Sequence, residues 1–454
     1  MEEKEKNFCT VNWAELPSPA IEKVFIYTSR ADQDSMSKVC RKWNHEYGSP
    51  ALWKIFKFIL SRHRCSTEIY PEVQAARKYG NMFKYVDIKF NSVRRNCINL
   101  MFVQVKLFLE AMSRSSQLSS IKVINFGNYF KHLSDGQNTV LFQTLNEFFN
   151  TQKNLNTVIF IKSEFGQEEG LVILNNVFNC DNNKIRKLTL RGFVKENNNR
   201  VLSEDYAETF AGVIAKISQV KVLEIDYNLF FEKLIHDLTS ERLQLPSTAS
   251  GMTEIHLLCE GKNYRNFRGI HSQTWRRVKR MFRNLEVHMN IKIYSNLMSE
   301  TRRYLTDGIP LKSLDFTFQK VFVSAGTTLT SMLTYLQTCS LHEHLENISI
   351  VYKGHIDDFS GSVVPFFQSC LNLVVFCIYV TYAPDNIESI LTSLLENHST
   401  SLKICKIKFD YVNNNYSAQY LYSLSENFAP LFMNRGIVLN VEYPFPYRRM
   451  QGSS

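Results

Sequence analysis

His342 and His344, which flank Glu343, are the most conspicuous potential metal ligands in the chain. Side chains two positions apart do not share a face of a helix, and the segment directly precedes an expected β-strand. We therefore interpret these residues as a surface turn and not as a ligand pair. A zinc site has little support elsewhere, because no CxxC pair is present. The sequence predicts no metal ion and no cofactor.

The ten cysteines are scattered singly, and we expect reduced, mostly buried thiols. Cys370 and Cys377 are expected at the end of a helix and on a strand. Nucleophilic catalysis needs a base and an orienting group beside the nucleophile, and neither cysteine has a supporting His or Asp nearby. HExxH, GxSxG, P-loop and dinucleotide-binding motifs are absent as well. We therefore predict a chain that is not an enzyme.

The densest run of charge is WRRVKRMFR, from Trp275 to Arg283. Its basic residues share one expected helix with four apolar residues, and we favour an outer helix with a solvated basic side. The alternative is a docking site for an acidic or phosphorylated segment, because guanidinium groups match phosphate geometry. Nucleic-acid binding is less favoured, since no known binding module surrounds the run. The basic residues are Arg276, Arg277, Lys279, Arg280 and Arg283.

The bulk composition is that of a folded chain. Its 454 residues are 44% hydrophobic and 21% charged, which allows a large core. There is no long apolar run for a membrane span, and the start, MEEKEKN, does not resemble a signal peptide. We therefore expect the protein in the cytoplasm or nucleus. The net charge of +10 would suit an acidic partner, RNA or DNA, but we favour general surface basicity because basic residues occur along the whole chain.

The N-terminal region reads as three short helices. Between Pro17 and Arg30, apolar residues recur at three- and four-residue spacing, as in an amphipathic helix. A second helix is expected to begin near 32–35 and to include Val39, Cys40 and Trp43, and a third segment centres on Leu52. So small a module cannot bury its apolar surface by itself. The surplus surface must pack on the rest of the chain or contact another protein.

The order and spacing of these residues resemble the F-box. The resemblance rests on Leu16-Pro17, an Ile-x-x-Val-Phe helix, a Val-Cys-x-x-Trp helix and a Leu-Trp close. It implies docking on a Skp-type adaptor, which connects to cullin and RING subunits. Thr28, Gln33 and Lys38 depart from the residues frequent in that family. Carried over by position, the adaptor-binding residues are Leu16, Pro17, Ile21, Val24, Phe25, Val39, Cys40 and Trp53, whereas Trp43 is expected inside the module.

Behind this module, the pattern apolar-x-x-apolar-x-apolar recurs with starts 26 to 37 residues apart. A short strand signature at such a period is typical of a solenoid. Helical patterns lie between copies, beginning at Asn99, Ser203 and Asp385, the last two being potential N-caps. The copies begin at Phe83, Leu118, Leu155, Ile185, Val220, Met252, Leu311, Leu345, Leu373, Leu402 and Val438, with a looser twelfth copy at Leu285.

One strand and one helix per repeat predict a parallel sheet on the concave face and helices outside. The pattern resembles leucine-rich repeats, although the Asn that usually follows the strand is mostly missing, with Asn228 an exception. Asn182-Asn183, Asn197 to Asn199 and Asn413 to Asn415 are interpreted as loops.

Alternate strand residues should line the concave face, which solenoids use to bind extended partners. The candidate substrate-binding residues on this strip are Arg191, Glu224, Asp226, His256, Lys292, Tyr294, Asp315, Tyr379, Lys406 and Lys408, and the same parity places Asp87, Lys89, Lys122, Thr189 and Thr317 there.

The predicted fold is α/β, with a short all-α, three-helix F-box module followed by a leucine-rich-repeat-like solenoid. The resemblance implies a substrate-recognition subunit of an SCF-type ubiquitin ligase with an unknown protein substrate and without membrane contact. A non-ubiquitinating F-box scaffold and a basic repeat protein associated with nucleic acid are the alternatives. The expected organisation is a disordered start at 1–10, the F-box at 11–58, a connecting stretch at 59–80, the solenoid at 81–446 and a disordered tail at 447–454.

Overall fold

The structure, a computed structural model, describes most of the chain as two compact units. The first contains Met1–Ile185 and Gly192–Thr209, and the second contains Arg186–Arg191 and Phe210–Ser454. The predicted disordered ends, the Asn runs at 182–183 and 197–199, and the proposed caps Ser203 and Asp385 lie outside the described residues. Those residues are 13–60, 68–91, 95–178, 185–195, 207–240, 251–260, 269–294, 298–319, 325–352, 360–382, 387–397, 401–411 and 415–443.

The first unit begins with short helices, as predicted, but the expected second helix is divided in two. Ser29 caps the first half through its side chain, which accepts from the Asp32 backbone N–H. The helix ends before Lys38, and Cys40 has an extended backbone and precedes the next helix. Val39 therefore lies in a connection and not on a helix. The elements are η1 (Trp13–Glu15), α1 (Ser18–Ile26), α2 (Arg30–Ser37), α3 (Arg41–Tyr47) and α4 (Pro50–Trp53).

The rest of the first unit alternates strands with helices. Its first strand, β1, was not predicted, and it carries the same alternation of exposed and buried residues as the others. The predicted helix from Asn99 is confirmed as α6. The elements are β1 (Ile55–Leu60), α5 (Pro71–Tyr79), η2 (Gly80–Met82), β2 (Tyr85–Phe90), η3 (Arg95–Cys97), α6 (Ile98–Ser115), β3 (Ser120–Ile124), α7 (Phe126–Phe130), α8 (Asp135–Thr151), β4 (Thr157–Ile161) and α9 (Gln167–Phe178).

The second unit continues the alternation to the end of the described chain. Its elements are β5 (Lys187–Arg191), α10 (Ala207–Ile217), β6 (Val222–Asp226), α11 (Leu229–Leu238), β7 (Glu254–Glu260), α12 (Ser272–Met281), β8 (Glu286–Ile293), α13 (Met298–Tyr304), β9 (Leu311–Phe318), α14 (Ala325–Thr338), η6 (Leu341–His344), β10 (Asn347–Tyr352), α15 (Ser360–Ser369), β11 (Val375–Tyr382), α16 (Ile387–Asn397), β12 (Ile404–Tyr411), α17 (Asn415–Asn434) and β13 (Val438–Glu442).

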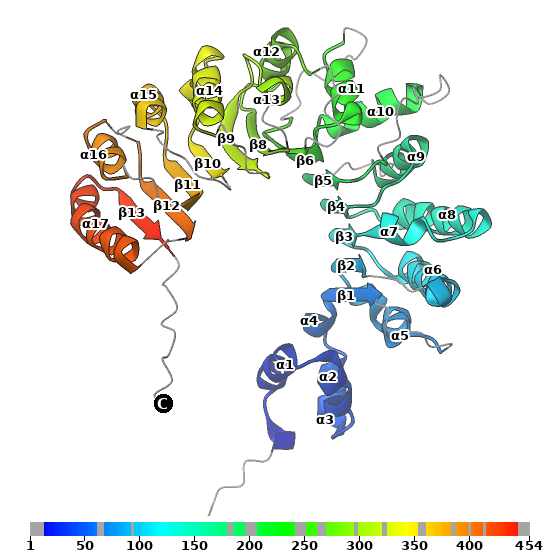
Figure 1. Cartoon of the computed structure of the whole chain (residues 1–454). Helices are drawn as coiled ribbons and strands as arrows, with labels where there is room; N and C mark the ends of the chain where they lie inside the picture. Colours follow the sequence, from blue (N-terminus) through cyan, green and yellow to red (C-terminus); the bar gives the residue numbers. More distant parts are fainter. Residues whose placement is uncertain are drawn as a thin grey trace, which may run out of the picture. The chain divides into compact units, whose positions relative to one another are not determined.

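In each unit the strands form a parallel sheet in which spatial order follows chain order, β1 to β4 in the first unit and β5 to β13 in the second. All twelve predicted strand copies are confirmed, as β2 to β13. In each unit the helices lie on one side of the strands (Figure 1). We call the other side the open face. Side chains directed at the helices are buried and the alternating ones reach the open face, as in β7 and β8, so the core lies between the sheet and its helices.

Several local predictions meet a clear outcome. Asn228 caps α11, because its side chain accepts from the Phe231 N–H. Asn415, expected in a loop, is the first residue of α17. Cys97 is disulfide-bonded, contrary to the expectation of reduced thiols, whereas Cys370 and Cys405 are free and buried. Helices as long and apolar as a membrane span do not occur in the described parts of the chain.

Candidate functional site

The helical module is held together by a small aromatic core. α1 buries Ile21 and Phe25, one turn apart and fully shielded from solvent. The ring of Phe25 meets that of Trp43 edge-on at 5.7 Å between centroids and that of Tyr47 at 5.8 Å. Trp43 therefore packs inside the module, and the Phe25 ring connects α1 to two aromatic residues of α3.

A buried polar group fixes the end of α1. Gln33 is only 6% exposed, and its Nε2 donates to the carbonyl oxygens of Phe25 at 2.6 Å and Thr28 at 3.2 Å. Arg30 donates in turn to Gln33 Oε1 at 2.7 Å. A helix C-terminus leaves carbonyl groups without helical partners. Gln33 satisfies two carbonyls at this end, which explains its presence where the resemblance led us to expect another residue.

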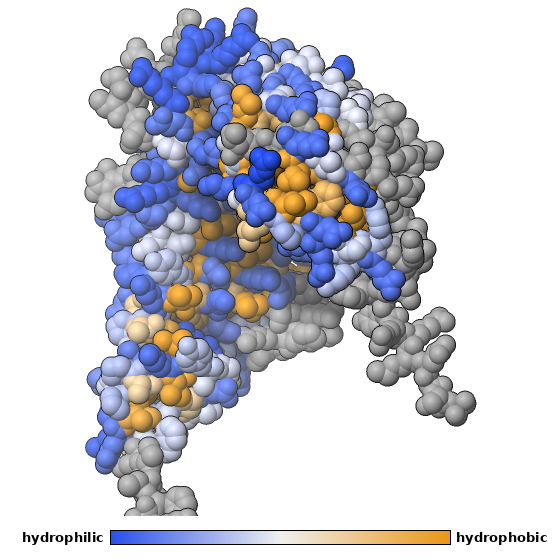
Figure 2. All heavy atoms as spheres, turned by 90° about the vertical axis from the view of Figure 1, so that its left-hand side faces the viewer, coloured by the Kyte–Doolittle hydropathy of each residue, from blue (hydrophilic) through white to orange (hydrophobic). Residues whose placement is uncertain are grey.

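Large apolar side chains remain on the surface of the module. They stand on η1, at the end of α1 and in the connection after α2, outside the stripe that forms the core. We call them the exposed apolar set. Its members are Trp13 at 64%, Ile26 at 59%, Tyr27 at 89% and Val39 at 70% exposure. Figure 2 shows hydrophobic surface over this module at the bottom of the view. Exposed apolar side chains on a small module are candidates for contact with another protein.

The predicted adaptor-binding residues divide into a surface group and a core group. Pro17 and Val39 are exposed, and Leu16, Val24 and Cys40 are half-buried. Ile21, Phe25 and Trp53 are buried in the protein's own core, with Trp53 only 2% exposed. These three side chains present almost no surface to a partner, so their role in the intact module is to shape it.

Sequence reasoning missed three members of the exposed apolar set. Ile26 and Tyr27 directly follow the core residue Phe25, and they fall off the three- and four-residue stripe of α1. An apolar residue on the wrong side of an amphipathic helix is itself a signal of a binding surface. Trp13 precedes the Leu-Pro opening, and its carbonyl accepts from Trp43 Nε1 at 3.1 Å. That bond holds the Trp13 backbone in place while its side chain stays exposed.

The open face of the repeats carries the predicted substrate-binding strip. Its residues are half-buried or exposed, which confirms the strand parity, except that Thr189 is buried and donates to Glu224 at 3.0 Å. Many of the charged members are paired across strands, as Lys292 is with Glu260 at 2.6 Å and Lys406 with Glu442 at 2.6 Å. Arg191 also pairs with Glu224. Such exposed pairs contribute little to stability, so a charged partner could replace them at small cost.

One cluster on this face brings together potential metal ligands. Atoms of Glu254, His256 and His288 lie within 4.8 Å of one another. The two imidazole rings, however, are stacked with centroids 4.5 Å apart and planes 9° from parallel. A metal ion binds the lone pair in the plane of each ring, and two stacked rings do not share a plane. Burial lowers the pKa of His288, and the neighbouring His256 lowers this pKa further. The geometry is that of two stacked histidines and not that of a metal site.

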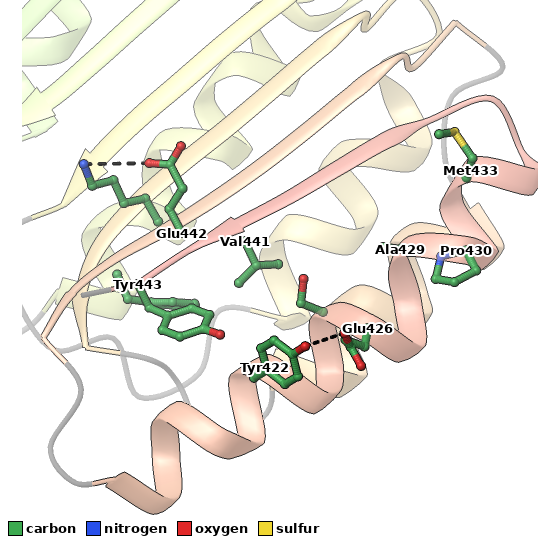
Figure 3. Close-up of a pocket in the computed structure, with 11 residues that line it drawn as sticks. Tyr422, Glu426, Ala429, Pro430, Met433, Val441, Glu442 and Tyr443 are labelled. Atoms are coloured by element: carbon green, nitrogen blue, oxygen red, sulfur yellow. Dashed lines mark hydrogen bonds and ion pairs between the residues drawn. The ribbon is translucent and has the colours of Figure 1, made fainter. Parts of the chain in front are cut away.

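A pocket of 1100 Å³ lies between α17 and β13 (Figure 3). Its wall combines apolar side chains with Glu426 and Glu442, and Tyr422 donates to Glu426 at 2.6 Å. Lys408, one of the predicted substrate-binding residues, also borders it. This pocket was not predicted from the sequence, because its walls come from β12, α17 and β13, which only the fold brings together.

The helical module matches a known domain. Residues 13–46 agree with the sequence profile of the F-box domain. That range contains all of the exposed apolar set and all of α1, α2 and its connection to α3.

Curated relatives share a limited stretch with the chain. F-box/LRR-repeat protein 21 of Bos taurus is 30% identical over 86 residues, which cover 18% of this chain and 20% of that protein. The proteins of the same name from Mus musculus and Ovis aries are each 31% identical over 86 residues, with the same coverage. The chain therefore matches about a fifth of the length of these relatives.

Proposed function

We propose that this protein is the substrate-recognition subunit of an SCF-type ubiquitin ligase. The helical module would dock on a Skp-type adaptor, and the repeats would hold a target protein. The match of residues 13–46 to the F-box domain supports the first part. The repeating sheet and the kinship with F-box/LRR-repeat proteins support the second.

The observation that carries the proposal is the exposed apolar set on a module that is otherwise well packed. Tyr27 and Val39 are 89% and 70% exposed, although Ile21 and Phe25 of the preceding helix are fully buried. Burial of apolar surface contributes a favourable free energy of about 25 cal/mol per Å². The module could bury these side chains on a partner without any change in its own core.

In this proposal Leu16, Pro17, Val24, Val39 and Cys40 contact the adaptor together with the exposed apolar set. Ile21, Phe25 and Trp53 act indirectly, because they fix the positions of α1 and α4. The mechanism is proximity: the adaptor joins the chain to the cullin and RING subunits, and the repeats raise the effective concentration of the target near the charged conjugating enzyme. The chain supplies no reactive group to the transfer.

The target would lie on the open face, where the charged strip reaches from Arg191 on β5 to Lys408 on β12. A partner with complementary charge could exchange its own groups for the cross-strand pairs. The pocket beside Lys408 adds an apolar site at the end of this strip. We include the whole predicted strip in the proposal, with Glu224, Asp226, His256, Lys292, Tyr294, Asp315, Tyr379 and Lys406 as further members.

The test is affinity capture from cells followed by a ubiquitin-transfer assay on the captured material. We compare the wild-type chain with a Tyr27→Ser/Val39→Ser variant. Adaptor, cullin and RING subunit should be captured with the wild type and lost from the variant, while target proteins remain on both. A Val103→Ser/Leu371→Ser variant is the matched control, because it removes two other exposed apolar side chains, from α6 and the turn after α15.

Two outcomes would change the proposal. Adaptor capture that is equal for the wild type and the Tyr27→Ser/Val39→Ser variant would refute the assigned surface. Capture of the adaptor without cullin and without ubiquitin transfer to any bound target would replace the ligase role by that of a non-ubiquitinating scaffold.

A further inference from the structure

The net positive charge of the chain is concentrated in one segment. Residues 261–285 contain eight Lys and Arg and no Asp or Glu, which leaves 45 of the 53 basic residues against all 43 acidic residues elsewhere. Most of the net charge of +10 therefore comes from 25 consecutive residues. This finding corrects the expectation of general surface basicity and directs attention to α12, the helix in this segment.

Two buried side chains fix the orientation of α12. Trp275 and Val278 are fully buried against the repeat core. Because these two side chains face the core, the basic residues on the other side of the helix face solvent. Arg283, just after the helix, is exposed as well. We call this surface the basic face of α12, and it consists of Arg276, Arg277, Lys279, Arg280 and Arg283, all exposed.

The basic face is poorly neutralised by the protein itself. Arg276 forms an ion pair with Asp307, and the Lys279 Nζ atom lies 3.5 Å from His344 Nε2. Among the residues that the structure describes, Arg277 and Arg283 have no ion-pair partner. Like charges three and four positions apart on a helix destabilise it, so this concentration of charge works against the stability of α12 in the free chain. An anionic partner would remove that repulsion.

We propose that the basic face of α12 binds an acidic segment, rich in Asp and Glu, of a partner protein. The pair between Arg276 and Asp307 already places one carboxylate on this face, and guanidinium groups form two parallel hydrogen bonds with carboxylates. The surface belongs to the helix side of the repeats, whereas the proposed target strip belongs to the open face (Figure 1). It is therefore a separate binding site from both surfaces in the proposed function.

Nucleic acid fits this face less well. Single-stranded nucleic acid is held by aromatic side chains on which bases stack, and both aromatic residues of the run, Trp275 and Phe282, are buried. Entry into the major groove requires a helix that projects from its domain. α12 instead lies in the row of helices beside the sheet and contacts α11.

The experiment measures binding of a fluorescein-labelled oligo-glutamate peptide to the full chain by fluorescence anisotropy at low salt. An Arg277→Glu/Arg283→Glu variant should bind about tenfold more weakly or worse. The control, Arg77→Glu/Arg114→Glu, changes the net charge by the same amount at two exposed arginines of α5 and α6, and it should bind within about twofold of the wild type. Circular dichroism confirms that both variants are folded.

Three results would overturn the proposal: no binding of the peptide to the wild type, equal loss in both variants, or an oligouridylate that binds more tightly than the peptide and is lost from Arg277→Glu/Arg283→Glu. The second result would indicate unspecific attraction, and the third would assign the face to nucleic acid. Adaptor capture by the Arg277→Glu/Arg283→Glu variant should equal that of the wild type, which separates this test from the proposed function.

Discussion

The indole ring of Trp53 lies face to face with the phenol ring of Tyr79, with centroids 4.2 Å apart and planes 17° from parallel. Trp53 ends α4 of the helical module, and Tyr79 ends α5, which follows the first strand. Arg30 of α2 lies over the same indole at 4.3 Å. The indole Nε1 also donates to the Tyr47 carbonyl at 2.6 Å. One side chain thus joins the module to the first repeat.

Truncation of this side chain should loosen the junction. We expect Trp53→Ala to lower the free energy of unfolding of the first unit by about 3–5 kcal/mol, as for other large aromatic residues in cores. The reason is loss of the aromatic contacts and of the bond to Tyr47, with a cavity left between α4 and α5. Hydrogen–deuterium exchange in peptides that cover α4, β1 and α5 measures the effect.

Trp13→Ala is the matched control, since it removes the same side chain from a position that is 64% exposed. In α4, β1 and α5, the free energy of unfolding derived from exchange should stay within about 0.5 kcal/mol of the wild-type value. Equal exchange in Trp53→Ala and the wild type would show that the junction is held by other contacts.

Gln33 gives a second test, of the polar side of the module. Gln33→Leu keeps the volume but removes the amide that donates to the carbonyl groups of Phe25 and Thr28. The Phe25 carbonyl keeps the N–H and hydroxyl groups of Thr28 as donors, so the Thr28 carbonyl is the group that loses its side-chain donor. A buried polar group without a partner costs about 1–3 kcal/mol. We expect urea unfolding, followed by tryptophan fluorescence, to report a loss of that size. A variant as stable as the wild type would mean that water replaces the amide.

The histidine stack predicts a dependence of stability on pH. Because the pKa of His288 is lowered in the folded protein, the unfolded chain binds more protons as pH falls through the ordinary histidine range, and stability must fall with it. Above that range the contribution is fully present. His288→Gln should therefore lose less stability than the wild type between neutral and mildly acidic pH, as measured by thermal unfolding across that range.

His236→Gln serves as the comparison, because the His236 side chain is 81% exposed. A His288→Gln profile parallel to the wild-type profile would exclude the stack as a source of acid sensitivity.

The repeats were predictable because each copy repeats one local pattern. Twelve strands were found from the spacing of apolar residues alone. β1 was not predicted, because Trp53 had been assigned to the last element of the region that resembles the F-box. Trp53, Phe56 and Phe58 in fact follow the same spacing, and β1 pairs with β2 so that Phe56 lies opposite Val86. Trp53 therefore belongs to both patterns, which explains its burial.

The candidate site was less predictable, for physical reasons. The sequence shows which residues are apolar, but packing decides which of them are covered. Phe25 and Tyr27 are both aromatic and two positions apart, yet one is buried and the other 89% exposed. The stack of His256 on His288 depends on the register of two strands whose paired residues are 32 positions apart in the chain (288 − 256). Such register follows from the fold and not from either segment.

The docking surface is best tested by a calorimetric titration of the purified chain with a purified Skp-type adaptor. We expect the wild type to bind the adaptor, and Tyr27→Ala/Val39→Asp to lose at least about a hundredfold in affinity. Val103→Ser/Leu371→Ser should bind like the wild type. An affinity of Tyr27→Ala/Val39→Asp within about twofold of the wild type would contradict the claim that the exposed apolar set is completed by the adaptor.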